Sequence, residues 1–162
     1  MNNKSFLIIS IFILILARLI PHPPNFTPVI AATMFSAYKF KNRNLSFLIP
    51  FISMIISDFI IGFHPNMLSV YFSLILISII SRNFFEKIII CSLFSSIIFY
   101  LITNFQVFMQ STVYQKNIMG LVNCYILAFP FFIMTLTSSI LFSFLIINIY
   151  SSITSLPQKI KI

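Results

Sequence analysis

The chain has 162 residues, of which 59% are hydrophobic and 7% charged, and its formal net charge is +8. Soluble domains have about a quarter of their residues charged because their surface faces water, so this composition excludes an ordinary soluble protein. The positive charges are scattered between apolar runs without forming a basic patch, which argues against nucleic acid as a partner. We therefore expect a single integral membrane domain, residues 1–162, in contact with the lipid bilayer.

Apolar runs alternate with short polar breaks, and each run of sufficient length predicts a transmembrane helix. Arg18 follows the first run directly and no cleavage site is evident, so we interpret that run as a retained span. Pro130 divides the long apolar stretch from Met119 to Tyr150, and we expect Met119 to Phe129 to form a short surface or re-entrant helix. The fold class is thus all-α, a polytopic bundle of six transmembrane helices. The predicted spans are Ser5–Ile20, Pro28–Phe40, Leu45–Phe63, Met67–Ile80, Ile88–Phe105 and Phe131–Tyr150.

The distribution of Lys and Arg predicts the orientation, because cytoplasmic loops carry an excess of these residues. With six spans, only Lys116 falls in a break on the opposite side, and Arg18 lies just inside the bilayer. We therefore expect both termini to be cytoplasmic. The positive charges that share the termini's side are Lys4, Lys39, Lys41, Arg43, Arg82, Lys87, Lys159 and Lys161.

The uncommon polar residues converge on the outer half of this predicted bundle, as an outward-facing binding cavity requires. Asp58 is the one acidic residue within a span, and Arg18 lies at a similar depth as its natural partner. The pair either lines a ligand site or clamps two spans together, and the two roles are compatible. The candidate substrate-binding residues are Arg18, His22, Asn25, Thr27, Asp58, His64, Thr103, Asn104, Tyr114 and Tyr125.

The proline-rich segment from Arg18 to Pro28 predicts a stiff, extended path between the first two spans. Thr27 suits a helix cap and Pro28 a first helical turn. The second span is then expected to begin below the outer surface, with its free N–H groups favouring a carboxylate or phosphate. The alternative is a rigid connecting loop. The polar stretch from Gln106 to Met119 could close over the cavity.

The sequence gives little indication of metal binding, ATP hydrolysis or catalysis. Two histidines with Asp58 form a thin ligand set, so we predict no metal site, and no cofactor. Cys91 and Cys124 read as small buried hydrophobic residues. The two glycines of the chain cannot build a phosphate-binding loop, so ATP hydrolysis by that route is excluded. We predict no catalytic residues and no enzyme, although an intramembrane enzyme using His22, Asp58 or His64 remains an alternative.

Several blocks in order along the chain resemble the pattern of a bacterial family of unknown function, DUF6580, whose members are regarded as candidate transport proteins. They cover most of the chain. The blocks are Arg18 to Pro28, Ala31-Ala32-Thr33-Met34-Phe35-Ser36-Ala37, Pro50, Ser57-Asp58, Gly62-Phe63-His64, Met67, Leu101-Ile102-Thr103-Asn104-Phe105, Tyr114, Gly120-Leu121, Cys124-Tyr125 and Pro130-Phe131-Phe132.

The plan of this family resembles the S components of energy-coupling-factor (ECF) transporters, six-helix proteins that bind a micronutrient from outside. The resemblance implies a substrate-binding subunit for uptake of a small solute, such as a vitamin, in the bacterial inner (plasma) membrane. It also implies a transmembrane subunit and ATPases as partners, since no ATP site is expected here. The alternative is a structural or assembly protein whose polar cluster only packs the bundle.

Overall fold

The computed structural model describes residues 3–40 and 42–154, and these residues form six helices and no strand. The all-α class is confirmed. The first five helices begin within two residues of the start predicted for a span, and the polar breaks form the turns between the helices. The helices are α1 Asn3–Leu19, α2 Val29–Lys39, α3 Arg43–Ile61, α4 Met67–Phe84, α5 Ile88–Gln110 and α6 Ile118–Thr154.

The predicted start of the sixth span at Phe131 is wrong. Residues 118–154 form a single helix of 37 residues, and Pro130 lies inside it instead of separating a surface helix from a sixth span. Proline removes one backbone hydrogen bond, but apolar surroundings offer no alternative partner for the remaining N–H and C=O groups, so the helix continues on both sides. Helix α5 likewise runs five residues past its predicted end at Phe105, to Gln110.

Helix α2 is the centre of the bundle, although it has only 11 residues. It packs against α3, α4 and α6 and also meets α5, and all its side chains from Val29 to Ala37 are buried. Small side chains such as Ala32 and Ser36 let the neighbouring helices approach closely. The small residues of this helix therefore serve internal packing.

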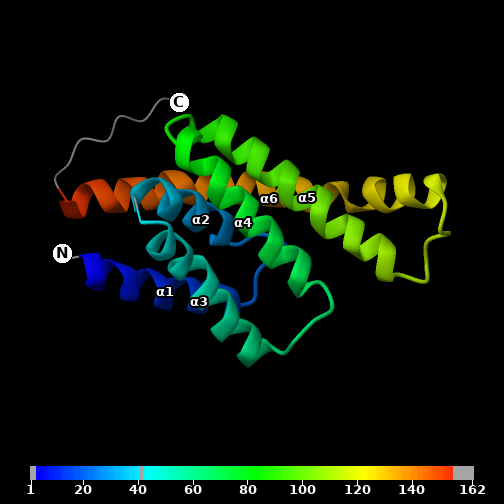
Figure 1. Ribbon diagram of the computed structural model, residues 1–162, viewed down its shortest axis with the longest axis horizontal. Coiled ribbons are helices and arrows are strands. Elements are labelled where there is room, and N and C mark those ends of the chain that lie inside the picture. The colour runs from blue at the N-terminus through cyan, green and yellow to red at the C-terminus, as the bar shows by residue number, and fades with distance from the viewer. Residues whose placement is uncertain (1–2, 41, 155–162) are drawn as a thin grey trace.

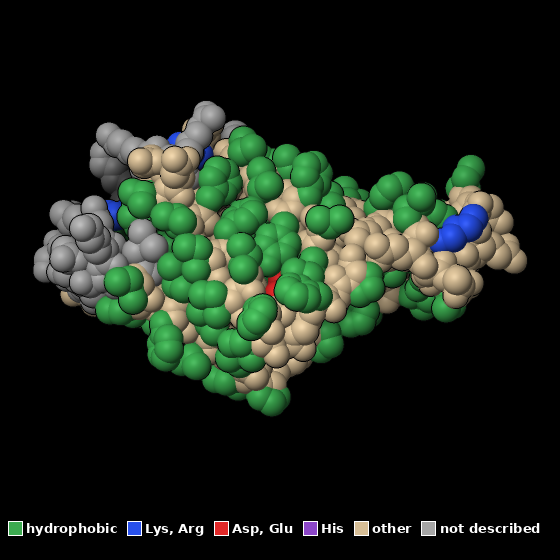
Figure 2. Space-filling view, turned by 60° about the horizontal axis from the view of Figure 1, so that its bottom comes forward, with side chains coloured by type: hydrophobic (Ala, Val, Ile, Leu, Met, Phe, Trp, Pro, Cys, Tyr) green, Lys and Arg blue, Asp and Glu red, His purple; other side chains and the backbone are tan. Residues whose placement is uncertain are grey.

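The polarity of the bundle is reversed relative to that of a water-soluble protein. Its buried polar side chains are nearly all Ser and Thr, while large apolar residues such as Phe59 and Leu68 are 77% and 80% exposed. In Figure 2, hydrophobic side chains cover most of the visible face, and Lys and Arg lie only toward its two ends. Such a surface is stable against lipid, which indicates a membrane protein.

Within the described part of the chain, three helices are long and apolar enough to cross a membrane by length and composition, with apolar segments Asn44–Ile61, Ile88–Gln110 and Ile118–Ser152. Helices α1 and α4 contain shorter apolar segments, Ile8–Leu19 and Met67–Asn83. At 1.5 Å per residue, α6 is about 55 Å long, well beyond a hydrocarbon core of about 30 Å. In Figure 1 it runs along the longest axis of the molecule.

Successive helices run in opposite directions, so their turns gather at two ends of the bundle (Figure 1). At one end, Tyr38 stacks on Phe85 and donates to Glu86, and the Lys39 ammonium lies over the Tyr150 ring. Lys39, Arg82 and Lys87 belong to this end, which we call the basic end. Of the other charges assigned to that side, Lys41, Lys159 and Lys161 lie outside the described residues.

The α5–α6 loop at the opposite end is held against both helices that it joins. The Lys116 ammonium donates to the carbonyls of Phe108, Met109 and Ser111 and so caps the C-terminus of α5. Asn117 Oδ1 accepts from Gly120 N–H at 2.8 Å and caps α6. A Cβ atom on Gly120 would lie 1.9 Å from the carbonyl oxygen of Gln115, so this contact requires glycine.

We predict that Gly120→Ala displaces the α5–α6 loop and destabilises the protein by about 1–3 kcal/mol, because the methyl group meets backbone that must move. Thermal unfolding of the purified protein measures this. Val122→Ala, an exposed position two residues along α6, is the matched control and should leave the melting temperature nearly unchanged. Equal melting temperatures for both variants would contradict the contact.

Candidate functional site

An ion pair between Arg18 on α1 and Asp58 on α3 lies beside a cavity of about 370 Å³. Arg18 Nη2 lies 2.7 Å from Asp58 Oδ1, and the Tyr71 hydroxyl of α4 donates to Asp58 Oδ2 at 2.8 Å. Arg18 Nη1 donates to Ser57 Oγ and, at 3.3 Å, to the Met54 carbonyl. The predicted pair is therefore present, and it joins three helices.

The two members of the pair differ in what they face. The Asp58 side chain is 1% exposed and both of its oxygens are engaged, so it lies behind the cavity wall. Arg18 is 14% exposed and lines the cavity. A guanidinium has five N–H donors, and the contacts given above use three of them. Arg18 thus presents a positive charge whose position is fixed by Asp58, with donors left for another group.

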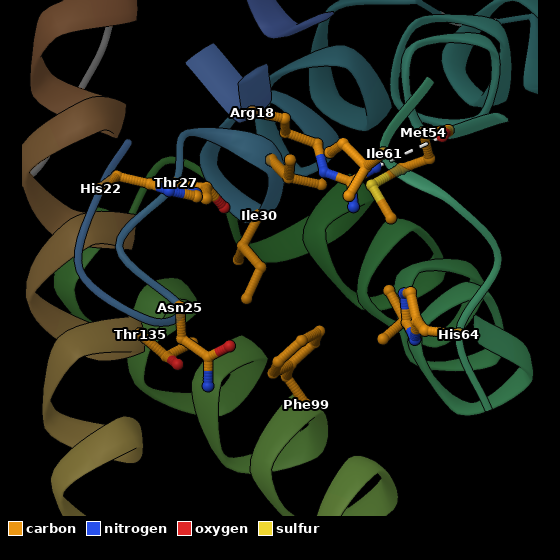
Figure 3. A pocket seen from close by; sticks show the side chains of 12 residues that line it. Arg18, His22, Asn25, Thr27, Ile30, Met54, Ile61, His64, Phe99 and Thr135 are labelled. Atoms are coloured by element: carbon orange, nitrogen blue, oxygen red, sulfur yellow. Dashed lines mark hydrogen bonds between the residues drawn. The ribbon is translucent and has the colours of Figure 1, made fainter. Parts of the chain in front are cut away.

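Two adjoining cavities of about 370 and 480 Å³ lie at the end of the bundle opposite the basic end, which we call the chamber end. They share Asn25, His64, Val70 and Phe99, and we call them together the chamber. Figure 3 shows Arg18, Ile30, Asn25, Phe99 and His64 arranged around the first cavity. Each volume falls within the range of about 300–1,000 Å³ typical of small-molecule pockets.

The structure brings eight of the ten predicted site residues to the chamber walls. Asp58 is the ninth and acts from behind Arg18. Tyr125 is the tenth, and it is not in the chamber. Its hydroxyl donates to the Leu101 carbonyl, and it lines one groove between α5 and α6 and another formed mainly by α4 and α5. The residues that line the chamber are Arg18, His22, Asn25, Thr27, His64, Thr103, Asn104 and Tyr114.

A tight turn positions Asn25 between the two cavities. Phe26 N–H donates to the Pro23 carbonyl at 3.0 Å, and Asn25 has φ 62°. Pro24 followed by Asn25 matches the residue preferences of a type II turn, which needs a positive φ at its third position. The Asn25 carbonyl also accepts from Ser138 on α6 at 3.3 Å, which holds the loop against the bundle.

The start of α2 differs from the prediction. Pro28, with φ −76° and ψ 1°, occupies the N-cap position, and no side chain caps the helix there. Thr27 lines the chamber instead. The first residue of the helix proper is Val29, which also lines the first cavity, and the first backbone hydrogen bond runs from Ala32 N–H to the Pro28 carbonyl.

Gln106 fixes the turn that carries His64, a role that the sequence did not suggest. Its Oε1 accepts from Ser69 N–H at 2.9 Å in the first turn of α4, and its Nε2 donates to the Pro65 carbonyl at 2.6 Å. The turn begins at Gly62, whose φ of 111° is accessible chiefly to glycine. These contacts tie the α3–α4 turn to α5. The loop that was expected to run from Gln106 to Met119 is shorter in the structure, because between α5 and α6 only residues 111–117 are non-helical.

Apolar residues complete the chamber, and these were also missed. Phe99 and Val107 flank Thr103 at four-residue spacing on α5, and Leu127 and Phe131 precede Thr135 at the same spacing on α6. Residues four apart share one face of a helix, so this spacing is the sequence feature that could have predicted a common apolar face on each helix. Tyr114 closes the second cavity from the α5–α6 loop. Burial and the neighbouring Cys124 raise the pKa of Tyr114, so its hydroxyl remains protonated at neutral pH.

The donor set suits hydrogen bonding to a small molecule better than metal binding. Among the described residues, no group of three or more His, Cys, Asp or Glu side chains could hold a metal ion. Cys91 and Cys124 are both buried and free, as expected.

The model of a family of unknown function, DUF6580, matches residues 1–160. Searches of curated proteins and of solved structures found no match.

We predict that Asp58→Asn destabilises the protein by about 3–5 kcal/mol, because it leaves the Arg18 charge partly buried and uncompensated. Melting temperature and abundance in membranes report the effect. Glu86→Gln removes the other acidic residue of the chain, which lies at the basic end, and should change both little. The double variant Arg18→Gln/Asp58→Asn should recover much of the loss, and an equally unstable double variant would contradict the ion-pair explanation.

Proposed function

The chain belongs to the DUF6580 family, and from that premise we propose that it is a membrane protein that binds a small solute in the chamber for uptake into the cell. In this proposal the chain resembles an S component: six spans cross the bacterial inner membrane, both termini are cytoplasmic, and the chamber opens to the outside. The observation that carries the proposal is a chamber with polar side chains from three helices and three loops, within a bundle whose surface is largely apolar.

The location of these polar residues supports binding over packing alone. A buried polar group that only packs the bundle is expected to find its partner within the protein. Asp58 and Gln106 do so, whereas His22, Asn25 and His64 line open volume. Polar side chains that converge on an otherwise apolar cavity are typical of small-molecule sites.

The charge distribution supports the proposed orientation. The basic end carries Lys39, Arg82 and Lys87, and the chamber end has Lys116 and the paired Arg18. Under the positive-inside rule, the basic end faces the cytoplasm and the chamber faces outward. Energy for uptake would come from a separate transmembrane subunit and ATPases, as the resemblance to S components implies.

Helix α2 is too short to cross a bilayer alone, since its 11 residues extend about 16 Å. The proline-rich loop from Pro21 to Pro28 leads down to its N-terminus within the chamber end. Loop and helix together make up the second span in our proposal. Irregular backbone is tolerated at such depth where it lines a cavity.

Single-cysteine labelling tests the orientation. In a background with Cys91→Ser and Cys124→Ser, we expect Phe63→Cys and Gln115→Cys to react with a membrane-impermeant maleimide in intact cells. Lys87→Cys should react only after the cells are permeabilised. Reaction of all three positions from the same side would rule out the proposed topology.

Native mass spectrometry tests the binding function. We expect protein purified from its membrane to retain a small solute, and His64→Ala to reduce the retained fraction about tenfold, a loss of roughly 1.4 kcal/mol. Normal abundance of the variant would separate binding from folding. Lys87→Ala, an exposed position at the basic end, is the control and should retain the solute. Wild-type protein without any retained solute would favour the structural or assembly role.

A further inference from the structure

We propose that the chamber selects an anionic solute with an apolar body, such as a small carboxylate or phosphate ester, and disfavours cations. The inference rests on the proposed function and specifies the substrate class of the same site. In this arrangement the anionic group lies beside Arg18 and the histidines, and the apolar body lies against Phe99 and Phe131.

The acidic residues of the chain decide against a cationic solute. The whole sequence contains two, Asp58 and Glu86. Asp58 accepts from Tyr71 with one oxygen, is paired to Arg18 through the other, and is shielded from the chamber. Glu86 accepts from Tyr38 at the basic end. A cation in the chamber would therefore find no carboxylate side chain, and a charge removed from water without a partner is strongly disfavoured.

The donors around the first cavity favour an anion. Arg18 is held by Asp58, Ser57 and the Met54 carbonyl, and the remaining N–H groups of its guanidinium are available to a ligand. His22 and His64 can each donate from a ring nitrogen, and Asn25 offers an amide beside both cavities. A carboxylate or phosphate oxygen accepts such charge-assisted hydrogen bonds well.

The second cavity fits the rest of the solute. Its walls include Val107, Leu127 and Phe131, with Phe99 shared between the two cavities. Asn104 and Tyr114 add hydrogen-bonding groups at its edge. Because Arg18 lines the first cavity and the apolar side chains of Val107, Leu127 and Phe131 line the second, a solute that spans both needs an anionic end and an apolar end.

Three probes of one shape and different charge test the assignment: 3-phenylpropanoate, 3-phenylpropanamide and 3-phenylpropylammonium. Binding to the full chain in lipid nanodiscs is measured by saturation-transfer NMR, with empty nanodiscs as the correction for partitioning into lipid. We expect the carboxylate to bind at least about tenfold more tightly than the ammonium, a difference of roughly 1.4 kcal/mol or more.

An isosteric variant adds the missing charge. Asn25→Asp keeps the left-handed turn, because Asn and Asp both tolerate that backbone conformation, and places a carboxylate beside both cavities. It should weaken binding of the carboxylate probe about tenfold and leave the amide probe within about twofold. Asn25→Gly keeps the turn without the charge and should preserve the preference for the anion.

The outcomes separate this inference from the proposed function. Equal or tighter binding of the ammonium or the amide overturns the charge assignment and leaves a solute-binding chamber in place. An unchanged preference in Asn25→Asp also overturns it. Binding of none of the three probes overturns the assignment together with the proposed binding function.

Discussion

The ion pair between Arg18 and Asp58 is the constraint on which the chamber depends. Helix α1 packs mainly against α3, with exposed apolar side chains on its other faces, and the pair fixes its C-terminal end. In surroundings of low dielectric constant an isolated charge is expensive, so neither residue is tolerated without the other. Tyr71 extends the contact to α4. The wall of the first cavity is therefore set by electrostatics as well as by apolar packing.

The helices were predictable because polar residues are rare in this chain and their positions interrupt the apolar runs. The Arg18–Asp58 pair was predictable for a related reason: charges at matching depth in two spans need each other. Pro130 misled the prediction because proline ends helices in water, where freed backbone groups are hydrated. In apolar surroundings the helix continues through it. The end of α5 was missed because Gln106 was assigned to a loop, whereas the helix continues to Gln110 and its last turn is stabilised by Lys116 from the following loop.

The predicted depth of the polar residues in the bilayer identified most of the residues that line the chamber. Depth does not specify the direction in which a side chain points. Tyr125 lies at the predicted level and faces the outside of the α5–α6 pair. Gln106 was assigned to a loop, although its two hydrogen bonds to the α3–α4 turn hold His64 at the chamber. Such contacts join residues far apart in sequence and have no local pattern. The turn at Pro24-Asn25 did have one, because proline followed by asparagine favours a positive φ at the second residue.

The pairing of Arg18 also determines how it can take part in binding. A ligand anion could in principle replace Asp58 as the partner of the guanidinium. Asp58 is held by Tyr71 and is shielded from solvent, so its displacement would leave a second charge buried without compensation. A ligand that uses the remaining donors of Arg18 incurs no such cost. In the proposed binding mode Asp58 therefore orients the guanidinium and stays in place when an anionic solute enters the chamber.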